Sequence, residues 1–292
     1  MNELLSSKQV AQMLGVNESS VKRWADSNYL KCIKTPGGHR KFSILDVNEF
    51  ISNRKHDSIH EFPEHPDISN NTEFLDKIKS KDFRWLAEQF YIHLISANRD
   101  KIFEFLKSAH IHHLSLTTIF DQILQPALYK IGVNWEHNVI TVDQEHQASA
   151  ALFSCLVRLN NETVKKPSNG KTAVLAVIEN DYHELPLKCL KLLIENEGWT
   201  VIYLGANVPF FSIDSAVKKY RPELTLISST LRVQDQSEIE DRLLNLKMYL
   251  KSHQGFLIVG GNGLSQNKLI SNSVDHWGKN FTDTMEFIKK IT

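Results

Sequence analysis

Two short helices separated by a turn are predicted near the start of the chain. Ser6 can cap the first helix, and Gln9 is placed to bond back to Ser6, as in a capping box. Gly15 can end this helix, and Asn17 can cap the next one. The apolar positions recur at helical spacing and are Val10, Met13, Leu14, Val21 and Trp24. This pattern predicts a helix-turn-helix.

A turn and a further helix follow. Segment 29–42 contains a Pro-Gly-Gly run at 36–38, and such residues favour a tight turn. Residues 43–46 form a second capping pattern, which opens a helix that should extend through Ile51. We therefore interpret the turn segment as a wing beside the helix-turn-helix, and residues 1–55 as one domain.

The next two segments differ from this domain and from each other. Residues 56–73 are polar, hold two prolines and show no periodicity, which predicts a linker. From residue 74 to 165 the apolar residues recur at helical spacing without strand-like alternation, so we expect a bundle of four or five helices. The last helix of the bundle should run from about residue 141 to 160.

Short β-rich runs alternate with helical stretches from residue 170 to 292. This alternation is typical of βαβ units, and it predicts an α/β Rossmann-like domain with a parallel sheet. The predicted strands are 172–178, 200–204, 224–228 and 256–259, with helices near 185–196, 211–220, 238–252 and 282–291. Ligands bind such sheets beyond the carboxyl ends of the strands. The loops that could hold a ligand are therefore 179–186, 205–210, 229–237 and 260–265.

Composition narrows the class of protein. The chain has 292 residues, 41% of them hydrophobic and 23% charged, which excludes disorder as an overall description. The longest apolar run, 173–178, is far shorter than the roughly 20 residues that span a bilayer. The first residues lack the features of a signal peptide, and the three cysteines show no paired spacing. We expect a cytoplasmic protein with reduced cysteines and no membrane partner.

Charge is balanced overall but not locally. The chain has 34 basic and 34 acidic residues, which argues against nucleic acid coating its whole surface. Residues 1–55 nevertheless hold nine Lys or Arg and five acidic residues. Short polar and basic side chains suit base edges and phosphates in a DNA groove. The candidate DNA-binding residues are Ser19, Ser20, Lys22 and Arg23 in the second helix and His39, Arg40 and Lys41 in the wing, where the turn would deliver all three side chains together.

The order of helix, helix, Gly-Gly-His-Arg wing and helix is a more specific signal. Through this order, residues 4–52 resemble the MerR-type transcriptional regulators. The resemblance implies a winged helix-turn-helix that binds a double-stranded DNA operator. The alternative is a helical hairpin that merely happens to be basic.

Three loops of the last segment carry candidate ligand-binding residues. A lone loop histidine such as His183 is more often structural than a ligand, but here two further loops accompany it. The candidates are Asp181, His183, Ser228, Ser229, Leu231, Gly260 and Gly261. Their order and spacing resemble the cobalamin-binding domain, with its Asp-x-His-x-x-Gly, Ser-x-Leu and Gly-Gly signatures. The resemblance implies that His183 is the lower axial ligand of cobalt and that Asp181 hydrogen-bonds its other nitrogen.

One position departs from that signature. Pro186 stands where the family has glycine, so the chain lacks an amide donor and gains a ring where the nucleotide tail of cobalamin would thread. Proline is acceptable in the first turn of a helix, so the backbone can be kept while tail binding weakens. Pro186 therefore motivates an alternative, a regulator of the same fold that is independent of cobalamin.

The helical segment adds Trp135 and, ten residues later, Glu145 and His146. Taken singly, each is more readily a core or solvated helix residue. Together they are similar to the Trp-x9-Glu-His motif of CarH-like light-sensing repressors, which carry all three segments in this order. The resemblance implies a bundle that caps the upper face of the cofactor, with Trp135 and Glu145 beside the 5′-deoxyadenosyl group and His146 as the upper axial ligand after light.

The resemblance implies a regulator that binds adenosylcobalamin in the dark, assembles into a dimer or tetramer, represses a promoter and is released by light. Methylcobalamin is the alternative cofactor. No phosphate loop and no nucleophile beside a base are found, so we expect no enzyme activity. A corrinoid carrier for a methyltransferase or mutase remains an alternative, against which the DNA-binding segment argues.

Overall fold

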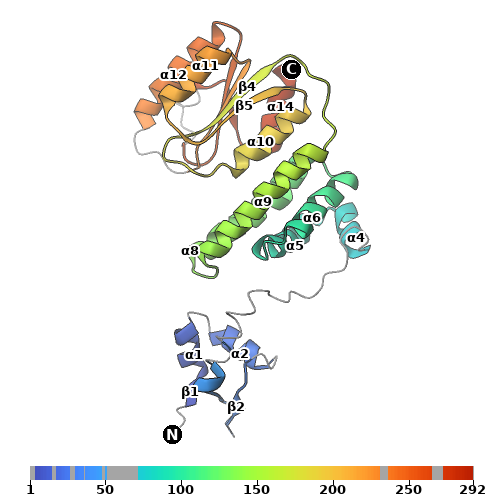
Figure 1. Cartoon of the computed structure of the whole chain (residues 1–292), viewed down its shortest axis with the longest axis vertical. Helices are drawn as coiled ribbons and strands as arrows, with labels where there is room; N and C mark the ends of the chain where they lie inside the picture. The colour runs from blue at the N-terminus through green and yellow to red at the C-terminus, as the bar shows by residue number, and fades with distance from the viewer. Residues whose placement is uncertain are drawn as a thin grey trace. The chain divides into compact units, whose positions relative to one another are not determined.

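The computed structural model of the chain describes residues 4–14, 18–26, 30–35, 37–47, 50, 72–230, 236–264 and 272–291 (Figure 1). Within these ranges the side chains of residues 12–14, 19, 20, 23, 236 and 237 are not described. The chain divides into two compact units, residues 1–65 and 66–292.

The first unit contains the two predicted helices, α1 (Ser7–Leu14) and α2 (Glu18–Asp26). The predicted capping box is present, since the Ser6 amide donates to Gln9 Oε1 at 2.9 Å and the Gln9 amide donates to Ser6 Oγ at 3.3 Å. The core that the helices share with the wing consists of Val10, Ala11, Val21, Ala25, Leu30, Phe42 and Val47. Residues 44–47 are helical, within the third predicted helix.

The wing is a small antiparallel sheet. Strands β2 (Ile33–Lys34) and β3 (Arg40–Ser43) pair across the predicted turn. A strand that the sequence pattern did not predict, β1 (Leu4–Ser6), pairs with the other edge of β3, so the order is β1-β3-β2. Three residues are too few to show a period of two, which is why sequence reasoning missed β1.

The second unit begins with helices, as predicted. They are α4 (Thr72–Ser80), α5 (Phe83–Ile95), α6 (Arg99–Ile111), α7 (Leu116–Ile119), the π-helical turn η2 (Phe120–Leu124), α8 (Gln125–Glu136) and α9 (Val142–Glu162). Asp82, Asn98 and Ser115 cap α5, α6 and α7 through their side chains. None of the helices in the described part of the chain is long and apolar enough to cross a bilayer.

A five-stranded parallel sheet follows. Its strands are β4 (Thr172–Ile178), β5 (Thr200–Val208), β6 (Leu224–Ser228), β7 (Phe256–Gly260) and β8 (His276–Gly278). The order is β5-β4-β6-β7-β8, so the chain reverses its direction of winding at β4. The predicted fold class is confirmed. The sequence predicted four strands and missed β8, a three-residue edge strand with no apolar run.

Helices cover both faces of this sheet (Figure 1). They are α10 (Leu185–Asn196), α11 (Phe210–Tyr220), α12 (Gln236–Lys251) and α14 (Phe281–Ile291). Side chains of β4 alternate between two cores, with Leu175 packed on the side of α10 and α14 and Val174 on the side of α11 and α12. Burial on both faces explains the continuous apolar run of β4. The first of these cores continues into helices α4 to α9.

A carboxylate of the bundle caps a helix of the sheet domain. Asp121 on η2 accepts hydrogen bonds from the Phe281 amide at 2.8 Å, the Thr282 amide at 2.9 Å and Thr282 Oγ1 at 2.6 Å. The rings of Phe120 and Phe281 pack at 5.5 Å beside these bonds. The first amides of α14 are thus satisfied by a residue about 160 positions earlier in the chain.

Replacing Asp121 with alanine is expected to destabilise the second unit, because the first turn of α14 loses its acceptor. Loss of a helix cap costs about 1 kcal/mol, which for a unit of this size lowers the melting temperature by about 2–4 °C. Thermal unfolding followed by circular dichroism measures the shift. The exposed Asp76→Ala on α4 is the control, and equal melting temperatures for the two variants would contradict the assignment.

Candidate functional site

The loop after β4 is organised by a buried carboxylate. Asp181 is 1% exposed, and its Oδ1 accepts from the His183 amide at 2.9 Å and from the ring Nδ1 of His183 at 2.8 Å. Its Oδ2 accepts from the Thr230 amide after β6. Since a carboxylate can only accept, Nδ1 carries the proton and the lone pair of the neutral ring lies on Nε2. The His183 side chain is 53% exposed, so this nitrogen belongs to a ring that a ligand can reach.

Asn207, at the end of β5, also holds the loop that follows β4. Asn207 Oδ1 accepts from the Asn180 amide at 2.8 Å, and the Asn207 amide donates to the Asp181 carbonyl at 2.9 Å. Asn207 Nδ2 donates to the Tyr182 hydroxyl at 3.0 Å. Asn180 and Asn207 both have left-handed backbones, with φ of 65° and 54°, a conformation that asparagine tolerates better than most residues. Asn207 thus supports the histidine loop from the end of β5.

The predicted hydroxyl and glycine loops meet at the ends of β6 and β7. Ser228 and Ser229 are buried, and the Ser229 amide donates to the Gly260 carbonyl at 3.0 Å. Gly261 has φ of 97°, and a β-carbon there would lie 2.1 Å from the Ser229 carbonyl oxygen. The sequence predicted these glycines as ligand-binding residues. The structure shows another reason for glycine at position 261, because the backbone that follows the neighbouring strand β6 lies against it. Leu231 lies outside the described residues.

Pro186 lies in the first turn of α10, where proline is compatible with the helix. The predicted tolerance of the backbone is therefore confirmed. The residues around it form a cluster that sequence reasoning missed. Tyr203 on β5 donates its hydroxyl to Glu184 Oε2 at 2.9 Å, and Lys188 Nζ lies 3.2 Å from the same carboxylate. Burial and the Glu184 carboxylate raise the pKa of Tyr203, so it remains a protonated donor.

The predicted residues of the bundle lie at the ends of two consecutive helices. Trp135 is near the end of α8 and is 49% exposed, whereas Glu145 and His146 are in the first turns of α9. His146 Nδ1 contacts the Glu145 carboxylate directly, and Ser149 Oγ donates to Glu145 Oε1 at 2.8 Å. Glu145 therefore orients His146, a contact that the sequence pattern did not indicate. The His146 side chain is 74% exposed.

Two contacts define how α9 lies along α10. Lys188 Nζ lies 3.7 Å above the centroid of the Phe153 ring, and Asn160 Nδ2 donates to Glu195 Oε2 at 2.7 Å. From the first contact to the second, the position advances by seven residues on α9, from Phe153 to Asn160, and by seven on α10, from Lys188 to Glu195. The two helices therefore run parallel here. His146 precedes Phe153 by another seven residues, about two turns, and shares this face of α9.

The candidate DNA-binding residues do not all point together. Lys22 is exposed on α2 and pairs with Glu18 at 2.9 Å, while Ser19, Ser20 and Arg23 lie on the same helix with side chains outside the description. In the wing, His39 is exposed, but Arg40 bonds to Asp26. The three wing side chains therefore do not share one surface in this structure, and their role in DNA binding stays a prediction. Successive side chains of a strand alternate in direction, so Arg40 and Lys41 point to opposite faces of β3.

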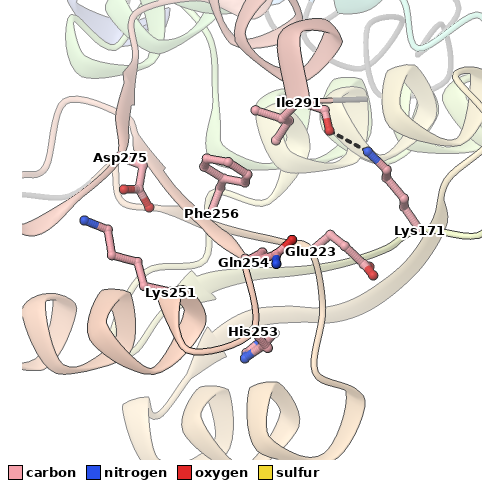
Figure 2. Close-up of a pocket in the computed structure, with 9 residues that line it drawn as sticks. Lys171, Glu223, Lys251, His253, Gln254, Phe256, Asp275 and Ile291 are labelled. Atoms are coloured by element: carbon pink, nitrogen blue, oxygen red, sulfur yellow. Dashed lines mark hydrogen bonds between the residues drawn. The ribbon is translucent and has the colours of Figure 1, made fainter.

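A cavity of about 420 Å³ lies at the opposite end of the sheet from the loops that follow β4, β6 and β7 (Figure 2). Figure 2 shows Lys171 reaching the carbonyl oxygen of Ile291. Glu223 accepts from the Thr172 amide and Asp275 from the Leu257 amide, each at 2.8 Å. The acidic groups thus satisfy strand amides at the amino edge of the sheet. Among the described residues, no group of three or more His, Cys, Asp or Glu is arranged to hold a metal ion.

The three cysteines are unpaired, and two of them lie in the core. Burial raises the pKa of the Cys155 thiol to about 11, and it raises the pKa of Cys189 as well. Both thiols are therefore protonated at neutral pH and act as packing residues.

Comparison with known families assigns all three segments. A helix-turn-helix domain model matches residues 4–55. Two models, each described as a B12 binding domain, match residues 86–159 in the helices and residues 171–280 in the sheet domain.

Individual relatives agree with this. The HTH-type transcriptional repressor CarH of Myxococcus xanthus is 31% identical over 131 residues, 45% of this chain and 43% of the relative. The repressor CarA of the same organism is 28% identical over 143 residues, 49% of this chain and 47% of the relative. The matches thus span less than half of the length of each of these relatives. The monomethylamine corrinoid protein of Methanosarcina barkeri shares the fold, with a TM-score of 0.56 at 16% identity over 72% of this chain and 99% of that one.

The fold and these matches define the class, a helix-turn-helix protein with two B12-binding domains. Within this class the chain is similar to the CarH and CarA repressors. The resemblance of the sequence motifs to helix-turn-helix repressors with a cobalamin-binding domain is thereby confirmed.

Proposed function

We propose that the chain is a light-responsive transcriptional repressor that acts in the cytoplasm. It binds double-stranded DNA as an oligomer, a dimer or a tetramer, when it holds adenosylcobalamin in the dark, and light releases it. When bound, adenosylcobalamin supplies a cobalt–carbon bond that light can break. The protein needs no enzymatic turnover for this role.

The geometry of Asp181 and His183 is the observation that carries the proposal. A metal-ligating histidine characteristically donates its other N–H to a carboxylate, which fixes the tautomer and the ring direction. Asp181 does this from a buried position, held in turn by the Thr230 amide and the Asn207 segment. The donor set therefore suits an imidazole that offers Nε2 to cobalt from below, the role proposed for His183.

The register of α9 and α10 supports the role proposed for the bundle. Helix α10 begins at Leu185. Extending the register of seven residues beyond that helix start would bring His146 level with position 181. His146 would then face the 179–184 loop across the space in which the corrin ring is expected. Because Glu145 holds Nδ1, the second nitrogen of His146 is the one that can become the upper ligand. Trp135 and Glu145 would flank the adenosyl group.

Such an arrangement supports a two-state regulator. The bundle and the sheet domain share a core, and they also meet through Asp121 and the Lys188–Phe153 contact. A ligand that fits between His183 and His146 would favour one arrangement of these parts, and its loss would favour another. DNA affinity would follow because several linked DNA-binding units bind more tightly than a single one.

An absorption spectrum tests the proposal. The purified chain is incubated with adenosylcobalamin in the dark and desalted, then examined before and after green illumination by spectroscopy and size-exclusion chromatography. Retained cofactor with light-induced changes in spectrum and size is the expected result. Retained cofactor without a change in size would contradict the regulated oligomer.

A regulator independent of cobalamin is the second candidate, and Pro186 is the observation that favours it. Its ring occupies the first turn of α10, where the family has glycine. Complete loss of cofactor on desalting, with DNA binding unaffected by light, would support this candidate. Restoring glycine with Pro186→Gly should then recover retention.

A further inference from the structure

Arg40, a basic side chain of the wing, is already engaged within the first unit. Arg40 makes a bidentate contact with the carboxylate of Asp26, with Nη2 at 2.7 Å from Oδ1 and 2.8 Å from Oδ2, and Nε at 3.3 Å from Oδ1. Asp26 is the last residue of α2, the second helix of the helix-turn-helix. The contact thus joins the turn end of the wing to the end of that helix.

The direction of Arg40 follows independently from the strand. Phe42 lies two residues further along β3 and is fully buried in the core of the first unit. Residues two apart share one face of a strand, so Arg40 points to the helical side of the wing and Lys41 to the other side. The Arg40 side chain is accordingly only 21% exposed.

The charges at this point also match one another. Lys34 of the paired strand β2 approaches Asp26 Oδ1 at 3.6 Å, so two wing cations face a single carboxylate. The hydrogen bond from Arg40 lowers the pKa of Asp26, and the hydrogen bond to Asp26 raises the pKa of Arg40. Both groups are therefore charged at neutral pH. A planar guanidinium on a carboxylate fixes direction as well as distance, unlike a lysine.

We propose that Arg40 is a positioning residue, which anchors the wing to α2 through Asp26, and that Lys41 and His39 are the wing residues that face DNA. This inference rests on the proposed DNA binding of the first unit. It divides the basic wing motif into an anchor and a contact surface. An anchor sets the angle between wing and helix, and thereby the register of both on the duplex.

The salt dependence of DNA binding tests this division. The probe is a fluorescent duplex selected from a random library by the wild-type chain. Each phosphate contact contributes about 0.9 to the slope of log affinity against log salt. Lys41→Gln should lower that slope by about this amount. Arg40→Gln and Asp26→Asn should each weaken binding by up to about fivefold with the slope unchanged, and the double variant should be no weaker than either.

The opposite pattern would overturn the proposal. If Arg40 contacts phosphate, Arg40→Gln lowers the slope as Lys41→Gln does, and Asp26→Asn tightens binding because it removes a competing carboxylate. Exchanging the charges of Asp26 and Arg40 distinguishes an anchor from a phosphate contact. Asp26→Arg combined with Arg40→Asp should bind more tightly than Arg40→Asp alone, and no recovery would count against an anchor, since an aspartate cannot replace a phosphate ligand.

A measurement without DNA keeps the anchor testable by itself. Hydrogen exchange of the wing amides in the full chain should accelerate in Arg40→Gln and Asp26→Asn, and remain as in the wild type in Lys41→Gln. Equal exchange in all variants would contradict the anchor. A wild-type chain that selects no duplex would overturn the proposed DNA binding, and the exchange rates would still decide whether Arg40 holds the wing.

Discussion

Replacing His183 with alanine is expected to abolish histidine coordination of cobalamin and to cause most of the bound cofactor to be lost on desalting. The physical reason is the Asp181–His183 pair, in which a buried carboxylate orients the imidazole and leaves Nε2 for the metal. Without the ring, the loop keeps its backbone but offers no nitrogen. Absorption spectra of the dark and illuminated variants, compared with those of the wild type, measure the effect.

A matched variant separates coordination from general damage. His137→Ala removes another exposed histidine, one that bonds to the Val133 carbonyl, and it should leave the spectrum unchanged. Asp181→Asn should lower cofactor affinity by about 10-fold to 100-fold, as loss of a supporting carboxylate does at metal sites. An unchanged cobalamin spectrum in His183→Ala would refute the assignment of the lower ligand.

Gly261→Ala is expected to destabilise the second unit strongly and to disturb the end of β6. Its φ of 97° is strained for any side chain, which costs about 1–3 kcal/mol. The new β-carbon would also lie 2.1 Å from the Ser229 carbonyl oxygen, and relieving such overpacking costs about 1–3 kcal/mol more. Urea unfolding of the variant and the wild type measures the loss of unfolding free energy.

Gly205→Ala is the control for the cost of a side chain at a positive φ. Gly205 has almost the same φ, 96°, but among the described residues nothing lies within 4 Å of a β-carbon built there. The difference between the two variants therefore isolates the clash with Ser229. Equal losses of stability would show that β6 and β7 do not approach each other as closely as described.

Local pattern was sufficient for much of the fold. The strand 172–178 and the helix 185–196 were predicted with the bounds that the structure shows, because the strand is a continuous apolar run and the helix has a helical apolar period. The capping box of Ser6 and Gln9 is also confirmed, since both partners lie within one helical turn. The hydrogen bond between Asp181 and His183 was predicted through the resemblance to the cobalamin-binding domain, and the structure shows it.

Partners distant in sequence required the tertiary structure. Asp121 reaches Thr282, and Asp26 reaches Arg40 although the intervening turn separates them. Neither acid shows a pattern that identifies its partner, because a single carboxylate in a helix is most often solvated. The short strands β1 and β8 exist only through their pairing with β3 and β7. Gly261 was predicted as a ligand-binding residue, but its close contact with Ser229 became evident only from the packing of β6 against β7.

The sequence by itself determined the order of the segments, the class of each fold and the residue types placed at the strand ends, because periodicity and motif spacing are local properties of the chain. Only the tertiary structure decided which of these residues face each other. It placed Arg40 on the core side of the wing and Glu145 against His146, and it aligned α9 with α10 in parallel. The direction of a side chain depends on the contacts of the element that carries it, and those contacts come from segments far away in the sequence.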